Sequence, residues 1–148
     1  MKVLFLHGLE SKPGGSKSIY LQDKGHEVLN PALPKSSFPK SIQIAQEQID
    51  NEKPDVIVGS SRGGAIAMAV NPRGARLVLV APAWKNFNVK PSVPSGTIIL
   101  HSPSDEIIPF ADSRKIEGAS AVVPVGDGHR MFDEEALAAI EKAVQGGF

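Results

Sequence analysis

The chain of 148 residues contains no cysteine. Disulfides, thiolate catalysis and cysteine-ligated zinc are therefore excluded. An excess of charge is also lacking, because 16 Lys and Arg residues balance 16 Asp and Glu residues. This balance gives no reason to expect nucleic acid or an anionic membrane surface as a partner.

Long apolar runs are missing as well. No run approaches the ~20 residues of a membrane span. The first apolar stretch, VLFL, ends at a His-Gly pair and is too short for a secretory signal, so we expect a cytoplasmic protein. No repeat, low-complexity tract or linker divides the chain, and its length fits a single domain over residues 1–148.

Short apolar runs alternate with segments of helical period. Strands that are apolar on both faces and separated by helices indicate a parallel sheet covered on both sides. We therefore expect a three-layer α/β/α domain with a parallel sheet of about six strands. The expected strands are residues 3–6, 26–29, 55–58, 76–80, 97–100 and 121–125, and the expected helices are residues 16–24, 41–52, 63–70, 109–114 and 133–144.

A glycine-serine turn joins the third strand to the helix after it. Residues 59–63, Gly-Ser-Ser-Arg-Gly, have the form G-x-S-x-G, which places the central serine on a sharp strand-to-helix turn. Ser61 would then lie above the sheet edge, with the Arg62 amide able to stabilise an oxyanion. A plain turn with glycines for its geometry explains these five residues equally well, so the rest of the chain must decide.

A serine nucleophile needs a base, and the base needs an orienting carboxylate. The expected chain order is Ser, acid, His. His129 follows the sixth strand and Asp105 follows the fifth, so both lie in suitable loops. Each alone is also explained as an ordinary loop residue. Glu106 and Asp127 are rival acids, but Glu106 is one position off and Asp127 is too close in sequence to His129, so we favour Asp105.

The loop after the first strand supplies a fourth element. It begins with His7 and Gly8, and it faces the serine turn if the first and third strands are neighbours. The backbone amide of Leu9 is the expected second oxyanion donor. We expect His7 to be structural and to bond loop backbone, because it comes directly off the strand.

Together these features resemble the α/β-hydrolase family. The stretches "FLHGLESKPGGSK" and "GDGHRMFDEEAL" are similar to its small, nearly lidless serine esterases, and the resemblance covers most of the chain. The resemblance implies a minimal α/β-hydrolase fold with Ser61 as nucleophile, His129 as base and Asp105 as acid. It also implies an oxyanion hole made by the amides of Leu9 and Arg62.

The chain departs from the family pattern in three places. The usual first two strands are missing. Arg62 replaces a more typical residue after the nucleophile, and its guanidinium either binds a substrate anion or is solvated or paired with an acid at the surface. Residues 83–95 are too few for a helical cap domain, so we expect an open site. Within them, Trp84 and Phe87 either wall an acyl pocket or close the end of the sheet as core.

These observations predict a serine hydrolase, a carboxylesterase acting on short-chain or soluble esters. Its partner is a small-molecule ester, and neither metal nor organic cofactor is needed. Thioester, amide or C–C hydrolysis by the same triad remains open, as does a catalytically silent binding module. A flavodoxin-like nucleotide binder is disfavoured, because the first strand is not followed by G-x-G-x-x-G and no P-loop lysine is present.

Overall fold

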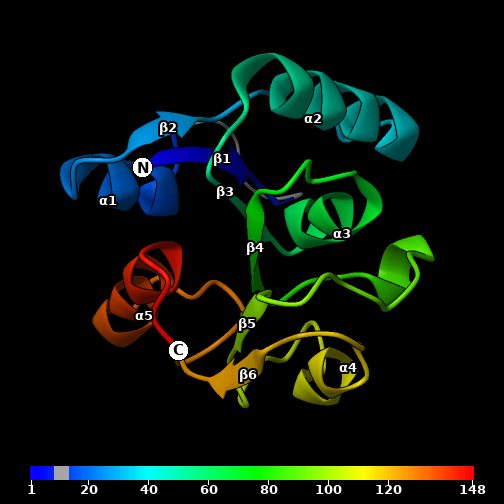
Figure 1. Ribbon diagram of the computed structural model, residues 1–148. Coiled ribbons are helices and arrows are strands. Elements are labelled where there is room, and N and C mark those ends of the chain that lie inside the picture. The colour runs from blue at the N-terminus through cyan, green and yellow to red at the C-terminus, as the bar shows by residue number, and fades with distance from the viewer. Residues whose placement is uncertain (9–13) are drawn as a thin grey trace.

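The computed structural model describes residues 1–8 and 14–148. Its centre is a six-stranded sheet in which every strand pairs in parallel, in the order β2-β1-β3-β4-β5-β6 (Figure 1). The strands are β1 (Lys2–Leu6), β2 (Glu27–Leu29), β3 (Val56–Ser60), β4 (Arg76–Val80), β5 (Ile98–His101) and β6 (Ala121–Pro124). The helices are α1 (Ser16–Asp23), α2 (Phe38–Glu52), α3 (Arg62–Ala69), α4 (Phe110–Arg114) and α5 (Glu134–Val144), with a 3-10 turn, η1 (Lys85–Phe87).

Helices cover both faces of the sheet, and each face has its own apolar core. One core joins alternate residues of the central strands, such as Val58 and Val80, to α1 and α5 through residues such as Leu21 and Ile140. The other core joins the intervening strand residues to α2 and α3 (Figure 1). The central strands are therefore buried on both sides, which explains their continuous apolar sequence.

The boundaries differ from the predicted ones mainly at α2. This helix begins at Phe38, earlier than predicted, because Ser37 caps it by accepting a 3.1 Å hydrogen bond from the Lys40 amide. The turn η1 was not predicted. Among the described residues, no helix combines the length and apolar character needed to cross a bilayer.

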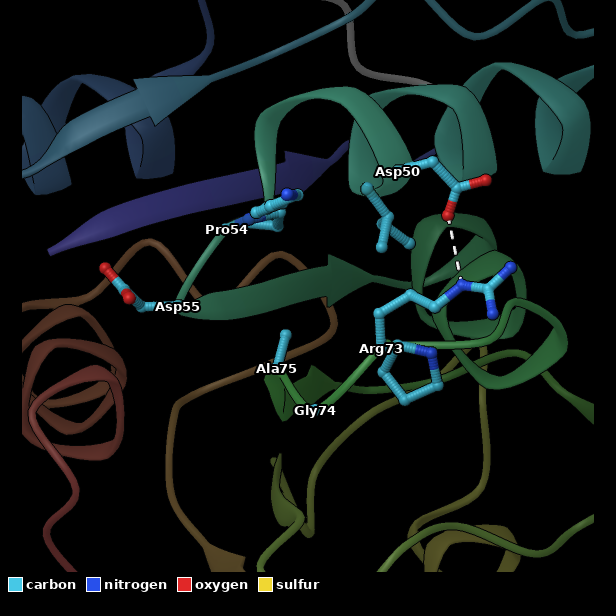
Figure 2. A pocket seen from close by; sticks show the side chains of 9 residues that line it. Asp50, Pro54, Asp55, Arg73, Gly74 and Ala75 are labelled. Carbon is cyan, nitrogen blue, oxygen red and sulfur yellow. Dashed lines mark hydrogen bonds and ion pairs between the residues drawn. The ribbon is translucent and has the colours of Figure 1, made fainter.

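The strand order reverses beside β1, since β2 lies on one side of it and β3 on the other. Ligand sites of open parallel sheets lie at such a switch point, beyond the carboxyl ends of the strands. A pocket at the opposite end of the sheet, about 510 Å³ in volume, lies between the end of α2 and the loop before β4 (Figure 2). Its Arg73 is paired with Asp50 at 3.1 Å, and its lining contains no serine, threonine or histidine.

Candidate active site

The turn between β3 and α3 holds Ser61 in a rare backbone conformation. Its φ of 56° and ψ of −114° lie outside the regions that ordinary residues favour. The turn is fixed by tertiary bonds, since the Ser61 amide donates to the Val80 carbonyl at 2.9 Å and the Ser61 carbonyl accepts from Ala83 at 3.0 Å. Strain at a nucleophile that the surroundings hold in place is typical of a functional site.

The glycines of the motif are required by close packing. A Cβ on Gly63 would lie 1.9 Å from the Leu6 carbonyl oxygen, and one on Gly59 would lie 2.4 Å from the Gly63 oxygen. No side chain fits at either position without moving backbone. The two glycines therefore let α3 start directly against β1, which brings Ser61 to the switch point of the sheet.

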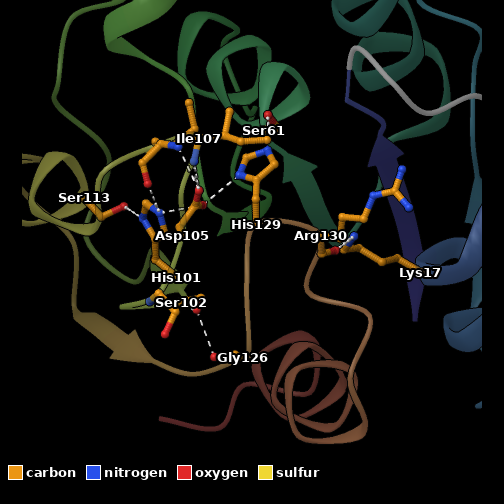
Figure 3. Close-up of polar contacts among 12 residues, drawn as sticks. Lys17, Ser61, His101, Ser102, Asp105, Ile107, Ser113, Gly126, His129 and Arg130 are labelled. Carbon is orange, nitrogen blue, oxygen red and sulfur yellow. Dashed lines mark hydrogen bonds and ion pairs between the residues drawn. The ribbon is translucent and has the colours of Figure 1, made fainter.

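Three side chains from distant parts of the chain meet at this edge (Figure 3). The Ser61 Oγ lies 3.0 Å from Nε2 of His129, and His129 Nδ1 lies 2.7 Å from Oδ2 of Asp105. Both lengths are those of direct hydrogen bonds. With Nδ1–H donating to the carboxylate, Nε2 is left as the acceptor that faces the serine hydroxyl, which is the arrangement of a nucleophile, a base and an orienting acid.

Asp105 is held as a carboxylate. Its side chain is fully buried, and burial alone would raise its pKa, but hydrogen bonds from His129 and from the Ile108 and Ile107 amides outweigh burial and lower the pKa. The two amides donate to Oδ1 at 2.8 Å each. The rival Glu106 is exposed.

The loop that carries His129 is tied to the loop after β5. The Ser102 hydroxyl donates to the Gly126 carbonyl at 2.9 Å, and the Asp127 amide donates to the Asp133 carboxylate at 3.2 Å. Asp127, the other rival acid, is exposed, and the hydrogen-bond partners of His129 within the described residues are Asp105 and Ser61. The sequence motif thus places His129 on an anchored turn between β6 and α5.

One predicted oxyanion donor can be located. Arg62 is the first residue of α3, and its amide makes no hydrogen bond within the part of the chain that the structure describes. Gly8 lies beside Ser61, because a Cβ there would be 3.4 Å from the Ser61 Cβ. Leu9, the predicted second donor, lies outside the described residues, so its role stays a prediction.

The Arg62 side chain is not at the surface, and the expectation of a solvated or surface-paired guanidinium was wrong. It is only 2% exposed and donates to the Pro34 carbonyl at 2.8 Å and to the Ser41 hydroxyl at 3.1 Å. Its guanidinium carbon lies 5.6 and 5.7 Å from the rings of Phe38 and Phe87. Burial lowers the pKa of Arg62. The side chain fastens the turn at Ser61 to the start of α2.

His7, Trp84 and Phe87 lie near the site and have different contacts. His7 accepts from the Leu33 amide at 3.1 Å through Nε2 and lies 2.9 Å from the Gly8 carbonyl through Nδ1, so it bonds loop backbone as expected. Trp84 packs against the core and donates to the Asp112 carbonyl at 3.0 Å. Phe87 instead lines the pocket in front of Ser61, a cleft of about 540 Å³.

A second histidine extends the network behind Asp105, and sequence reasoning missed it. His101, the last residue of β5, is fully buried, and its Nε2 lies 3.1 Å from Asp105 Oδ2 and 3.0 Å from the Ile108 carbonyl. Both partners are acceptors, so Nε2 carries the proton, and Nδ1 accepts from the Ser113 hydroxyl at 2.6 Å. Burial lowers the pKa of His101, which favours this neutral form.

No family model and no curated protein matches the chain. Several solved structures are similar to the chain. The chain is similar to alpha/beta hydrolase domain-containing protein 10 from mouse, with 14% identity and a TM-score of 0.77 over 97% of this chain and 88% of that one. It is similar to a monoacylglycerol lipase of Paleococcus ferrophilus, with 15% identity and a TM-score of 0.75 over 99% and 95%. It is also similar to an alpha-beta serine hydrolase homologue from Coxiella burnetii, with 18% identity and a TM-score of 0.69 over 97% and 83%.

These likenesses span nearly the whole chain and concern the arrangement of strands and helices. The chain therefore has the α/β-hydrolase fold, here in a minimal form with six parallel strands, and the predicted fold class is confirmed.

Proposed function

We propose that this protein is a serine hydrolase that cleaves carboxylic esters through an acyl-enzyme. The observation that carries the proposal is the hydrogen-bonded series from the Ser61 hydroxyl through His129 to Asp105, with contacts of 3.0 and 2.7 Å. A strained serine at a strand-to-helix turn supports the same chemistry, and so does the Arg62 amide beside it, which bonds to none of the described residues.

In the first half of the reaction, Ser61 Oγ bonds to the acyl carbon while its proton passes to His129 Nε2. The carbonyl electrons move to the oxygen, which faces the Arg62 amide. The bond from the acyl carbon to the alkoxy oxygen then breaks, and His129 gives its proton to the leaving alcohol. Asp105 keeps the imidazole in the correct tautomer and stabilises its positive charge.

In the second half, water replaces the alcohol. His129 takes a proton from the water while the water oxygen attacks the acyl carbon, and the proton then returns to Ser61 as the acid leaves. A cleft of about 540 Å³ without a covering domain suits short-chain or soluble esters better than long lipid chains.

Turnover of p-nitrophenyl acetate by the wild type and by Ser61→Ala tests the proposal. We expect turnover by the wild type and a loss of at least about 10³-fold in the variant, with an unchanged circular dichroism spectrum. Lys24→Met, a substitution on the exposed end of α1, serves as a control that keeps its activity. Equal turnover by wild type and Ser61→Ala would contradict a serine mechanism and support a binding module instead.

The same residues could attack thioesters or amides. A panel of matched acyl groups carried on oxygen, sulfur and nitrogen leaving groups measures the preference directly. We expect the oxygen ester to have a higher kcat/KM than the amide, because an alcohol is a better leaving group than an amine.

A further inference from the structure

Three cationic residues line the pocket that contains Ser61, and among residues 1–8 and 14–148 its lining includes no aspartate or glutamate. They are Lys17, Arg62 and Arg130. Across residues 1–8 and 14–148, none of the three forms an ion pair with a carboxylate. The pocket lining therefore contains cations that no described carboxylate pairs with, although the whole chain is neutral.

Lys17 is the least expected member of this group. It lies in the first turn of α1 and is only 7% exposed, and its Nζ donates to the Arg130 carbonyl. The ammonium also lies 4.4 Å from the centre of the Phe132 ring. An ammonium has three donors, and the Arg130 carbonyl uses one of them. The Lys17 Nζ makes no other hydrogen bond within residues 1–8 and 14–148, and Lys17 is among the residues that line the cleft.

The burial of Lys17 is unfavourable by itself. Burial, and then the charge of Arg130, lower its pKa to about 8. A methionine would fill the same space without desolvating a charge. The lysine thus adds positive charge to the cleft at the expense of folding stability.

Arg130 completes this wall of the pocket. It follows His129 directly in the chain, is exposed, and places its guanidinium carbon 5.5 Å from the centre of the Phe132 ring. Figure 3 shows the Lys17 side chain reaching to the Arg130 backbone. Two neighbouring cations repel each other, and an anion between them removes that repulsion. Arg62 is already bonded to Pro34 and Ser41, so it adds charge behind the pocket and is not available as a ligand contact.

We propose that the substrate carries an anionic group, a carboxylate or a phosphate, that binds to Lys17 and Arg130 while its ester carbonyl lies at Ser61. The inference rests on the proposed function and names its substrate class. The other wall of the cleft contains Phe87, Ile107 and Ile108, which suits a short hydrocarbon linker. The substrates expected are therefore half-esters or esters bearing a phosphate, small enough for an open cleft.

Two esters of equal length test the proposal. Mono-p-nitrophenyl glutarate carries a free carboxylate, and p-nitrophenyl pentanoate is its neutral counterpart. At low ionic strength we expect the wild type to favour the glutarate in kcat/KM by about tenfold or more, because a charge-assisted hydrogen bond contributes about that factor. Glutarate and inorganic phosphate, added separately as inhibitors of pentanoate hydrolysis, distinguish the two anion sources.

Substitutions of Lys17 and Arg130 test whether these two cations cause the preference for the glutarate. Lys17→Met and Arg130→Met should each reduce the ratio of kcat/KM for the glutarate to kcat/KM for the pentanoate about tenfold, mainly through KM for the glutarate; the ratio cancels any effect of the substitution that is common to both esters. Lys24→Met removes the same charge from the exposed end of the same helix and should keep the full preference. Thermal melts of all three confirm that they are folded.

The outcomes separate the two proposals. Ser61-dependent pentanoate hydrolysis with no glutarate preference, and no inhibition by either anion, overturns the anion site and leaves the hydrolase intact. A preference that Lys17→Met and Arg130→Met do not change also overturns it. If the wild type hydrolyses neither ester in a Ser61-dependent reaction, the proposed function itself is refuted.

Discussion

Replacing Lys17 by methionine should make this protein more stable and less selective. The buried ammonium has a pKa of about 8, against 10.5 for a solvated lysine. Below pH 8 the folded protein must keep a proton that it binds less tightly than the unfolded chain does. The linkage relation turns this difference into a destabilisation of about 3 kcal/mol at pH 7.

The sign of the pH dependence follows from the lowered pKa. Between pH 8 and 10.5 the unfolded chain binds more protons than the folded one, so the wild type gains stability as the pH rises. Lys17→Met lacks this group, and all other groups titrate alike in both proteins. Relative to the variant, the wild type should therefore gain about 2.5 kcal/mol of stability between pH 7 and pH 10.

Urea unfolding of both proteins at pH 7, 8, 9 and 10, followed by circular dichroism, measures this difference. Lys24→Met should show no comparable pH-dependent difference, because Lys24 is exposed. A constant difference between wild type and Lys17→Met across this range would show that Lys17 titrates as a solvated lysine. Burial would then not lower the pKa of Lys17.

Three further substitutions probe the site. Asp105→Asn should lower kcat by about 10⁴-fold, because the imidazole loses the partner that fixes its tautomer. A stopped assay with an activated ester measures kcat, and an unchanged value would rule out Asp105 as the acid. Because the pKa of Asp105 is lowered in the folded protein, the stability of the wild type relative to Asp105→Asn should fall only below about pH 4. Acid titration of both proteins, followed by circular dichroism, measures this difference. His101→Ala should lower kcat by about ten- to a hundredfold and alter the pH profile of kcat/KM, because Asp105 loses a hydrogen-bond donor and the Ser113 hydroxyl loses its acceptor. A variant with full activity and the wild-type pH profile would show that His101 contributes only to packing. Gly63→Ala should lower the midpoint of thermal unfolding or prevent folding, because its Cβ would lie 1.9 Å from the Leu6 oxygen; a melt equal to wild type would show that this packing is not required.

Local sequence patterns predicted most of the fold. The central strands are apolar on both faces because helices cover both sides, so continuous apolar runs identified them directly. The turn at Ser61 was also recognisable, because the glycine spacing reflects a backbone approach that no other residue permits. The start of α2 was placed too late, since the capping contact of Ser37 involves one side-chain oxygen and leaves no apolar pattern.

The surroundings of the site were less predictable, because distant segments create them. Arg62 is buried by Pro34 and Ser41, which precede it by 28 and 21 residues. Lys17 is buried against a carbonyl 113 residues further on. His101 could have been suspected as a histidine four residues before the acid, but only the fold places Ser113 and Asp105 on opposite sides of its ring.

Labelling with a fluorophosphonate probe tests the central claim most directly. Intact mass and peptide mapping should find one adduct on the peptide that contains Ser61, with no adduct in Ser61→Ala and strongly reduced labelling in His129→Ala. An unlabelled native protein, or an adduct that persists in Ser61→Ala, would contradict the account of Ser61 as an activated nucleophile.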